Sequence, residues 1–328
     1  MVTRRRLVLL TAATLAARPL ASFAQGASSI PHIGYLSVGK PETNAAFLGA
    51  LKDALREYGY VDGKNITIDV RWAGSAAYEF PKLAATLVKE NPAAIVTTCI
   101  PSTRAAKQAT RAIPVVMSVD GDPVSAGLVA SLARPGANVT GTSTLFEELI
   151  PKWLELIRLA VPQSRNIAVL RNTEDVADPY FWVKFKQASE TTGVNVMSFG
   201  AKVAEDLDGA LAAMRKQSAD ALIVRTDAFL AGQAARLVPL AQLNRLPAIY
   251  GFSEFPDAGG LMSYGFSFRE YYKGVAKYVD AVLKGTPPAD LPVQQPTKIE
   301  LVINLESARK VGIVMPPQLL ARADRVIG

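Results

Sequence analysis

The sequence contains very few of the residues from which disulfide scaffolds and zinc centres are built. Its 328 residues include one cysteine, Cys99, and one histidine, His32. A single cysteine cannot close an internal disulfide, and these two residues lie too far apart in sequence to indicate a zinc site. A Ser-His-Asp triad would have to use His32, just before the first predicted strand. We therefore expect Cys99 to be a small buried apolar residue and His32 to be structural or exposed, and we predict no metal site and no catalytic residue.

Motifs of the commonest catalytic centres are absent as well. There is no GxxxxGK[ST], no GxGxxG after the first predicted strand, no HExxH and no GxSxG. The formal charge is +7, but Arg4, Arg5, Arg6 and Arg18 lie in a segment that we expect to be removed, which leaves +3. No basic run interleaved with aromatic residues follows. The sequence thus predicts neither a nucleic-acid partner nor a cofactor.

The first residues have the order of an export signal. A positively charged start, Thr3 to Arg6, precedes the apolar run from Leu7 to Ala17, and Ser22-Phe23-Ala24 resembles a cleavage site. We predict cleavage after Ala24, by the general (Sec) or the twin-arginine route, and a free monomeric protein in the periplasm. The alternative is an N-terminal membrane anchor, which the short apolar run disfavours. No later stretch reaches about 18 consecutive apolar residues, the minimum for a membrane span.

The stretch from Ile113 to Ser143 shows the plan on which the chain is organised. An apolar run, Ile113 to Val119, ends at Asp120-Gly121-Asp122-Pro123, and apolar residues from Val124 to Leu132 then recur at helical spacing. Asp122 suits a helix N-cap and Pro123 the first helical position. Residues 138–143 look like a further short strand. Strand, turn, helix and strand in this order indicate one part of a doubly wound parallel sheet.

The same alternation extends over the whole chain. At 49% hydrophobic and 20% charged residues, the chain can fill two cores. We predict an α/β fold with two doubly wound parallel-sheet lobes joined by a hinge. The predicted strands are 33–37, 66–72, 93–98, 113–119, 138–143, 166–170, 194–198, 221–224, 247–250, 260–264 and 298–303. The predicted helices are 44–58, 78–90, 101–112, 124–132, 149–161, 178–192, 204–217, 229–243, 269–284 and 317–326.

The two lobes are predicted to exchange chain three times. We place the crossings near Thr144, near Phe266 and in the proline-rich segment 287–292. Residues 1–24 are then the signal peptide, residues 25–144 with 267–288 the N-terminal lobe, and residues 145–266 with 289–328 the C-terminal lobe. The helix 269–284 returns to the first lobe in this scheme.

Polar side chains follow nearly every predicted strand at its carboxyl end, where open α/β sheets bind ligands. If the two lobes face each other across these ends, the side chains meet in one cleft. The candidate ligand-binding residues are Tyr35, Ser37, Thr98, Ser102, Thr103, Asp120, Asn172, Asp227, Glu254 and Tyr264.

Several of these residues also have structural interpretations. Ser102 and Thr103 open a helix, where N–H groups and the helix dipole favour an anion such as a ligand carboxylate, but they equally suit an N-cap. Asp227 suits a ligand ammonium group or an N-cap for the next helix. Asp120 fits a turn beside Gly121 better than a site. Single aromatic residues such as Tyr35 and Tyr264 more often belong to a core than to a stacking surface.

Three longer segments carry a resemblance to a known family. DGDPVSAGLVASLARPGANVTG, PAIYGFSEFPDAGGLMSYG and DLPVQQPTKIELVINLESARKVG, together with the start IGYLSVG, resemble substrate-binding proteins of ABC importers related to tryptophan and tyrosine transport. The resemblance implies a fold like that of type I periplasmic binding proteins, with two lobes that close on a ligand. It also implies that Ser102 and Thr103 hold the ligand carboxylate and that Asp227 faces its amino group. Relatives often have a small glycine-rich turn where this chain has Thr98-Cys99-Ile100-Pro101.

We accordingly predict a periplasmic solute-binding protein without chemistry of its own. It would capture a small organic ligand, an amino acid or another carboxylate, with aromatic ones included, and deliver it to an ABC permease and its ATPase. Two alternatives stay open from the residues alone. One is a ligand-sensing module for a membrane receptor, and the other is an exported hydrolase that uses Asp120, Asp122 or Glu254 as an acid or base.

Overall fold

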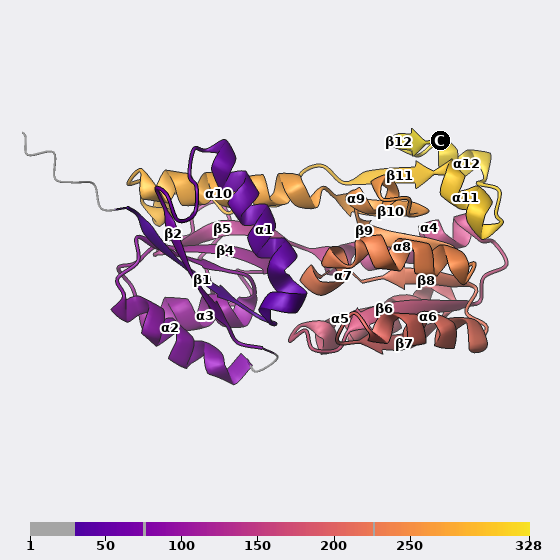
Figure 1. Cartoon of the computed structure of the whole chain (residues 1–328), viewed down its shortest axis with the longest axis horizontal. Coiled ribbons are helices and arrows are strands. Elements are labelled where there is room, and N and C mark those ends of the chain that lie inside the picture. The colour runs from indigo at the N-terminus through magenta and orange to yellow at the C-terminus, as the bar shows by residue number, and fades with distance from the viewer. Residues whose placement is uncertain (1–29, 75–76, 226) are drawn as a thin grey trace, which may run out of the picture. The chain divides into compact units, whose positions relative to one another are not determined.

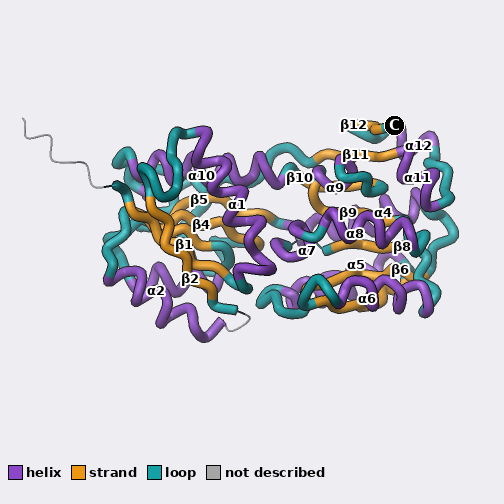
Figure 2. The backbone as a smooth tube through the Cα atoms, viewed as in Figure 1, coloured by secondary structure: helices purple, strands orange, loops and turns teal. Residues whose placement is uncertain are grey.

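Two β-sheets form the framework of the computed structural model, which describes residues 30–74, 77–225 and 227–328. The first sheet has the strand order β2-β1-β3-β4-β5 and the second the order β12-β11-β10-β9-β8-β6-β7 (Figure 1). Figure 2 shows the strands of each sheet accompanied by helices. The predicted α/β class with two parallel-sheet lobes is confirmed. The predicted signal peptide and its cleavage after Ala24 lie outside the described residues.

The first sheet is parallel throughout and covered on both faces. Its strands are β1 (His32–Ser37), β2 (Thr67–Trp72), β3 (Ala94–Thr97), β4 (Val115–Asp120) and β5 (Val139–Thr144), and its helices are α1 (Pro41–Glu57), α2 (Phe80–Lys89) after the turn η1 (Ala77–Glu79), α3 (Ile100–Ala109) and α10 (Phe268–Leu283). Neighbouring strand residues point to opposite faces. Tyr35 and Val116 therefore pack with α1 and α10, whereas Leu36 and Met117 pack with α2 and α3.

The predicted helix 124–132 between β4 and β5 is wrong. The chain there forms turns, although β4 and β5 still pair in parallel. Asp122 does accept the N–H of Val124, at 2.8 Å, and the hydroxyl of Ser125, as an N-cap would. Gly127 then takes a φ of 69°, which ends the turn before a helix can grow. Local capping residues were present, but the glycine stops propagation after one turn.

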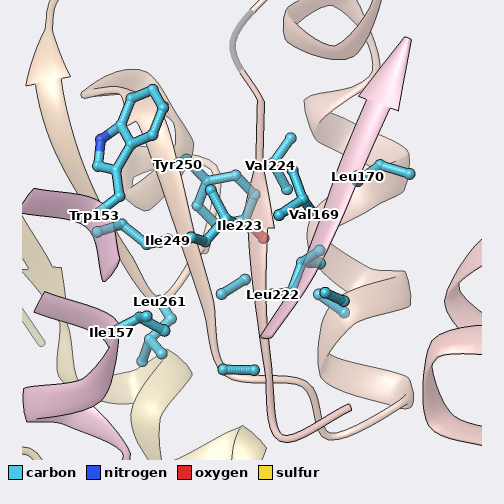
Figure 3. Packing of buried hydrophobic residues seen from close by; sticks show 14 of the residues in the cluster. Trp153, Ile157, Val169, Leu170, Leu222, Ile223, Val224, Ile249, Tyr250 and Leu261 are labelled. Carbon is cyan, nitrogen blue, oxygen red and sulfur yellow. The ribbon is translucent and has the colours of Figure 1, made fainter. Parts of the chain in front are cut away.

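The second sheet repeats the arrangement around a larger core. Its elements are α4 (Phe146–Ala160), β6 (Asn166–Asn172), α5 (Asp178–Thr192), β7 (Asn195–Ala201), α6 (Asp206–Lys216), β8 (Ala221–Val224), α7 (Ala228–Gly232), α8 (Ala234–Leu243), β9 (Ala248–Phe252), α9 (Glu254–Asp257) and β10 (Met262–Phe266). Trp153 of α4 is 1% exposed and donates its indole N–H to the carbonyl of Tyr264 at 2.6 Å. Figure 3 shows Trp153 on the side of Ile249 and Tyr250 of β9, and Ile157 next to Leu261.

The C-terminal segments differ from prediction in two places. After α10 and the turn η2 (Pro288–Asp290), Val293 N–H donates to Leu132 at 2.7 Å and Gln294 N–H to Gly141 at 3.0 Å, so the chain stays beside β5 beyond the predicted crossing at 287–292. It then forms β11 (Glu300–Asn304), antiparallel to β10, and α11 (Leu305–Val311). The predicted helix 317–326 is a single turn, α12 (Pro317–Leu320), followed by the edge strand β12 (Arg325–Ile327).

None of the helices within the described ranges is both long enough and apolar enough to cross a membrane.

Candidate functional site

A cavity of about 760 Å³ lies at the carboxyl ends of strands from both sheets. Its lining includes residues that follow β3 and β4 in the first sheet and β6 and β8 in the second, together with the start of α10. Small-molecule sites in proteins have volumes of roughly 300–1,000 Å³ and occur at this position in open α/β sheets. The cavity therefore fits a small organic ligand that touches both lobes.

Aromatic side chains supply much of the apolar lining. Phe146 stacks on Phe266 with ring centroids 4.8 Å apart, and Phe47 of α1 lies 5.0 Å from Phe268 of α10. Such faces suit the planar or apolar body of a ligand. The aromatic residues of the lining are Phe47, Phe146, Tyr180, Phe181, Phe252, Phe266, Phe268, Tyr271 and Tyr272.

Arg225, directly after β8, is the central charged group. Its side chain is 3% exposed, and its Nη2 and Nη1 atoms lie 2.5 Å from Asp175 Oδ2 and 3.5 Å from Asp227 Oδ2. The guanidinium also covers the ring of Phe181, with 4.4 Å between Cζ and the ring centroid. Burial lowers the pKa of Arg225, but the carboxylates of Asp175 and Asp227 outweigh it and raise the pKa above its ordinary value. Arg225 is thus permanently charged and already neutralised by its neighbours.

Two carboxyl groups of the lining have strongly raised pKa values. Asp120 Oδ1 accepts the hydroxyl of Thr144 at 2.9 Å and the N–H of Phe146 at 3.4 Å. Burial raises the pKa of Asp120 to about 7, against the opposing charge of Arg225. Asp227 Oδ1 accepts the N–H of Leu230 at 2.7 Å, and burial raises its pKa to about 7 as well. Both acids would gain from a further positive charge in the cavity.

Four of the ten predicted ligand residues line the cavity: Thr98, Asp120, Asn172 and Asp227. Thr98 donates its hydroxyl to Ser37 Oγ at 2.9 Å, and Asn172 Oδ1 accepts the N–H of Glu174 at 3.1 Å. Asp227 also caps α7, which confirms its predicted N-cap role. The structure brings these four side chains together from both lobes.

Ser102 and Thr103 lie outside the lining because their hydroxyls bind the chain that begins their own helix. Both donate to the carbonyl of Cys99, at 2.9 Å and 2.8 Å, and both side chains are buried. Thr103 Oγ1 also lies 2.7 Å from Thr97 Oγ1. The N-cap of this helix is Cys99, and Ser102 completes a capping box with it, so the predicted N-cap role of Ser102 and Thr103 is wrong. The cavity is lined instead by Cys99 and its neighbours Ile100 and Pro101.

The other four predicted residues also lie outside the lining. Tyr35 is in the core of the first lobe, with its ring 5.9 Å from that of Trp72, and Ser37 donates to the carbonyl of Val38 at 3.2 Å. Glu254 accepts the hydroxyl of Ser267 at 2.7 Å at the start of α10. Tyr264 packs against the core of the second lobe. Ser37 ends β1 and Glu254 follows β9 as predicted, whereas Tyr35 and Tyr264 lie within β1 and β10.

Sequence reasoning missed Arg225, Asp175 and Glu147 as parts of the lining. Arg225 carried a usable signal, because a charged residue immediately after the buried strand Ala221–Val224 has to find partners nearby. Asp175 lies in the loop after β6 and Glu147 in the first turn of α4. Neither position has a local pattern that separates it from an ordinary surface acid.

A second acidic group lies away from the cavity, at the edge of the first sheet. Ligand atoms of His32, Asp69 and Glu90 lie within 4.8 Å of one another. Arg71 contacts both Asp69 and Glu90, in the latter case at 2.8 Å from Nη2 to Oε1. The positive charge beside these carboxylates is therefore supplied by the protein itself.

Two α/β lobes with a ligand-sized cavity at the strand ends of both define the class of two-lobed ligand-binding proteins. A family model described as ABC transporter substrate binding protein matches residues 38–327, and the chain belongs to this family. The chain is 29% identical, over 84% of its own length and 79% of the relative's, to the tyrosine-binding protein of Clostridioides difficile (strain R20291).

Solved structures share the fold of this chain. A conserved domain protein from Vibrio cholerae is 28% identical, with a TM-score of 0.72 over 90% of this chain and 99% of that one. An ABC domain from Streptococcus pneumonia in complex with L-Trp is 26% identical, with a TM-score of 0.70 over 91% and 100%. The lac repressor, at 11% identity and a TM-score of 0.55, shares the fold alone.

Proposed function

We propose that this protein is the periplasmic binding component of an ABC importer and has no enzymatic activity. It captures a small organic ligand of the amino-acid class between its lobes and presents it to a membrane permease and its ATPase. The observation that carries the proposal is the cavity lined from both lobes, with Asp120 on the first and Asp227 on the second. Family membership and the export-signal pattern before residue 30 support it.

Ligand capture follows from the two-sided lining. A ligand that contacts both lobes stabilises only arrangements in which both contacts are made, so binding shifts the protein toward its closed state. The permease would then distinguish loaded from empty protein by the positions of the two lobes. The aromatic walls agree with relatives whose names specify tyrosine or L-Trp.

The experiment is a thermal-shift and calorimetric screen of the mature protein against single amino acids and their aromatic analogues. A ligand that binds only the folded state raises the melting temperature. At a ligand concentration a hundred times Kd, the free energy of unfolding rises by about 2.7 kcal/mol. Asp227→Asn should weaken binding, while Asp53→Asn on the exposed face of α1 should leave it unchanged. Turnover of a bound compound, or equal effects of the two variants, would contradict the proposal.

A further inference from the structure

We infer that the cavity recognises its ligand by a positive charge, seated between Asp120 and Glu147, and that aromatic amines bind more tightly than the amino acids of the same skeleton. The inference rests on the proposed function and names the ligand class of that cavity. It differs from recognition through a carboxylate, because two acids of the lining offer a seat for a cation, whereas the start of α3 is occupied by its own capping box.

The cation seat consists of two carboxylates, Asp120 and Glu147, and neither forms an ion pair within the part of the chain that the structure describes. Asp120 receives its hydrogen bonds from neutral donors, the hydroxyl of Thr144 and the N–H of Phe146. Glu147, in the first turn of α4, accepts the hydroxyl of Tyr180 at 3.2 Å through Oε1. Its Oε2 atom is buried and has no hydrogen-bond partner among the described residues.

These two carboxylates also act on each other. Burial is the main cause that raises the pKa of Asp120, and the negative charge of Glu147 raises it further. Arg225 opposes this from a distance, but its Nη atoms are engaged by Asp175 and Asp227. A ligand ammonium group would supply the missing charge and the hydrogen-bond donors that Glu147 Oε2 lacks.

An anionic ligand group finds no such place at the start of α3, where the helix dipole would favour it. Ser102 N–H donates to Cys99 Sγ at 3.5 Å, and Cys99 N–H donates to Ser102 Oγ at 3.2 Å. Pro101, between them, has no N–H. The first turn of this helix is thus occupied by its own capping box.

The lysines of the lining do not provide a strong binding place for an anion either. Lys202 has a side chain that is 62% exposed and lies 3.3 Å from Glu174. Lys40 is exposed and lies directly before α1. Exposed, flexible ammonium groups hold an anion weakly, since water screens the interaction.

Aromatic faces complete the selection. Phe146 donates its backbone N–H to Asp120. The rings of Phe146, Phe252 and Phe266 form one cluster, with centroid distances of 4.8 to 5.7 Å. Aromatic rings attract a nearby cation and bury an aromatic ligand body. An aromatic amine satisfies both the carboxylates and these rings, while its lack of a carboxylate leaves no unpaired anion in the cavity.

The first test uses three ligands that share one ring and one side-chain length and differ in charge. Tyramine, L-tyrosine and 3-(4-hydroxyphenyl)propionate carry a net charge that is positive, zero and negative, and tryptamine, L-tryptophan and indole-3-propionate form a second series. We expect calorimetry on the wild-type protein to give the lowest Kd for the amine. The Kd of the acid should be higher than that of the amine by roughly thirtyfold or more, as for loss of a buried charge partner.

The outcomes separate this inference from the proposed function. An amino acid that binds more tightly than its amine, or an acid that binds as tightly as the amine, overturns the inference and leaves the binding function intact. Failure of every aromatic ligand and every amino acid to bind overturns both.

The second test compares two adjacent glutamates of α4. Glu147→Gln should weaken amine binding by roughly tenfold or more, whereas Glu148→Gln, exposed one residue further along the same first turn, should leave it unchanged. Both substitutions remove one negative charge from the same first turn, so their effects on the helix dipole are matched. Equal Kd values for the two variants would remove Glu147 from the cation seat and overturn the inference.

Discussion

Arg225 Nη2 lies 2.5 Å from Asp175 Oδ2, which ties the end of β8 to the loop after β6. The same guanidinium lies 3.5 Å from Asp227 Oδ2, so one buried cation serves two carboxylates on the wall of the cavity. A buried ion pair has a large desolvation cost, and its partners depend on each other once it is formed. The integrity of this wall should therefore depend on Arg225 more than on either acid.

Arg225→Met should lower the free energy of unfolding by about 3–5 kcal/mol, since it leaves two buried carboxylates without their cation. Adding Asp175→Asn should recover part of the loss. Urea denaturation of both single variants and the double variant measures the coupling energy. Strict additivity would show that the two residues do not depend on each other.

Asp120 should make the protein less stable as the pH rises. Its pKa is about 7 in the folded protein and 3.8 ordinarily, so between these values the folded state binds more protons than the unfolded state. The free energy of unfolding then falls from about pH 4 to about pH 7. Each pKa unit is worth about 1.4 kcal/mol, so Asp120→Asn should stabilise the protein at pH 8 by on the order of 1–3 kcal/mol.

That variant should have almost no effect at pH 4, where Asp120 is protonated in the folded protein. Glu147 and Arg225, whose charges also act on the pKa of Asp120, are present in both wild type and variant. The difference between the two proteins therefore reports on Asp120 itself. Denaturation of wild type and variant at a series of pH values gives the difference directly. A difference that does not change with pH would contradict the assignment.

The layered fold was predictable because each buried strand is a short apolar run between turn residues. Ala221–Val224, for example, is wholly buried, and its sequence contains no polar residue. The failure between β4 and β5 came where two local signals disagree. The segment after Asp122 has helical spacing, but Gly127 at a φ of 69° ends the turn.

The site was less predictable because sequence shows where a strand ends and not where its last side chains point. Ser37 and Thr98 both follow the expected pattern, yet only Thr98 lines the cavity, with Ser37 accepting its hydrogen bond from behind. Glu147 gained its place from the packing of α4 against the strand ends. That relationship depends on tertiary structure, which no spacing within the first turn of α4 encodes.

Cys99 should react slowly with alkylating agents in the folded protein, although it lines the cavity. Burial raises the pKa of its thiol to about 12, while hydrogen bonds with Ser102 oppose the shift. Only the thiolate reacts, so the rate should rise about tenfold per pH unit from pH 7 to pH 10. Iodoacetamide labelling followed by mass spectrometry measures this rate, with urea-unfolded protein as the fast control. A rate that levels off near pH 9 would indicate an ordinary thiol.

Gly265 in β10 should be among the glycines least tolerant of substitution. A Cβ atom built there would lie 1.7 Å from the carbonyl oxygen of Gly251 in β9, and backbone cannot move aside as a flexible side chain can. Gly265→Ala should therefore lower the free energy of unfolding by about 3 kcal/mol or more.

Gly209 provides the matched control, because it lies exposed within α6 and a Cβ there meets nothing within 4 Å. Gly209→Ala should stabilise the protein by about 0.5–1 kcal/mol through helix propensity. Urea denaturation of the two variants should thus give changes of opposite sign, and a neutral Gly265→Ala would mean that β9 and β10 approach each other less closely at this position.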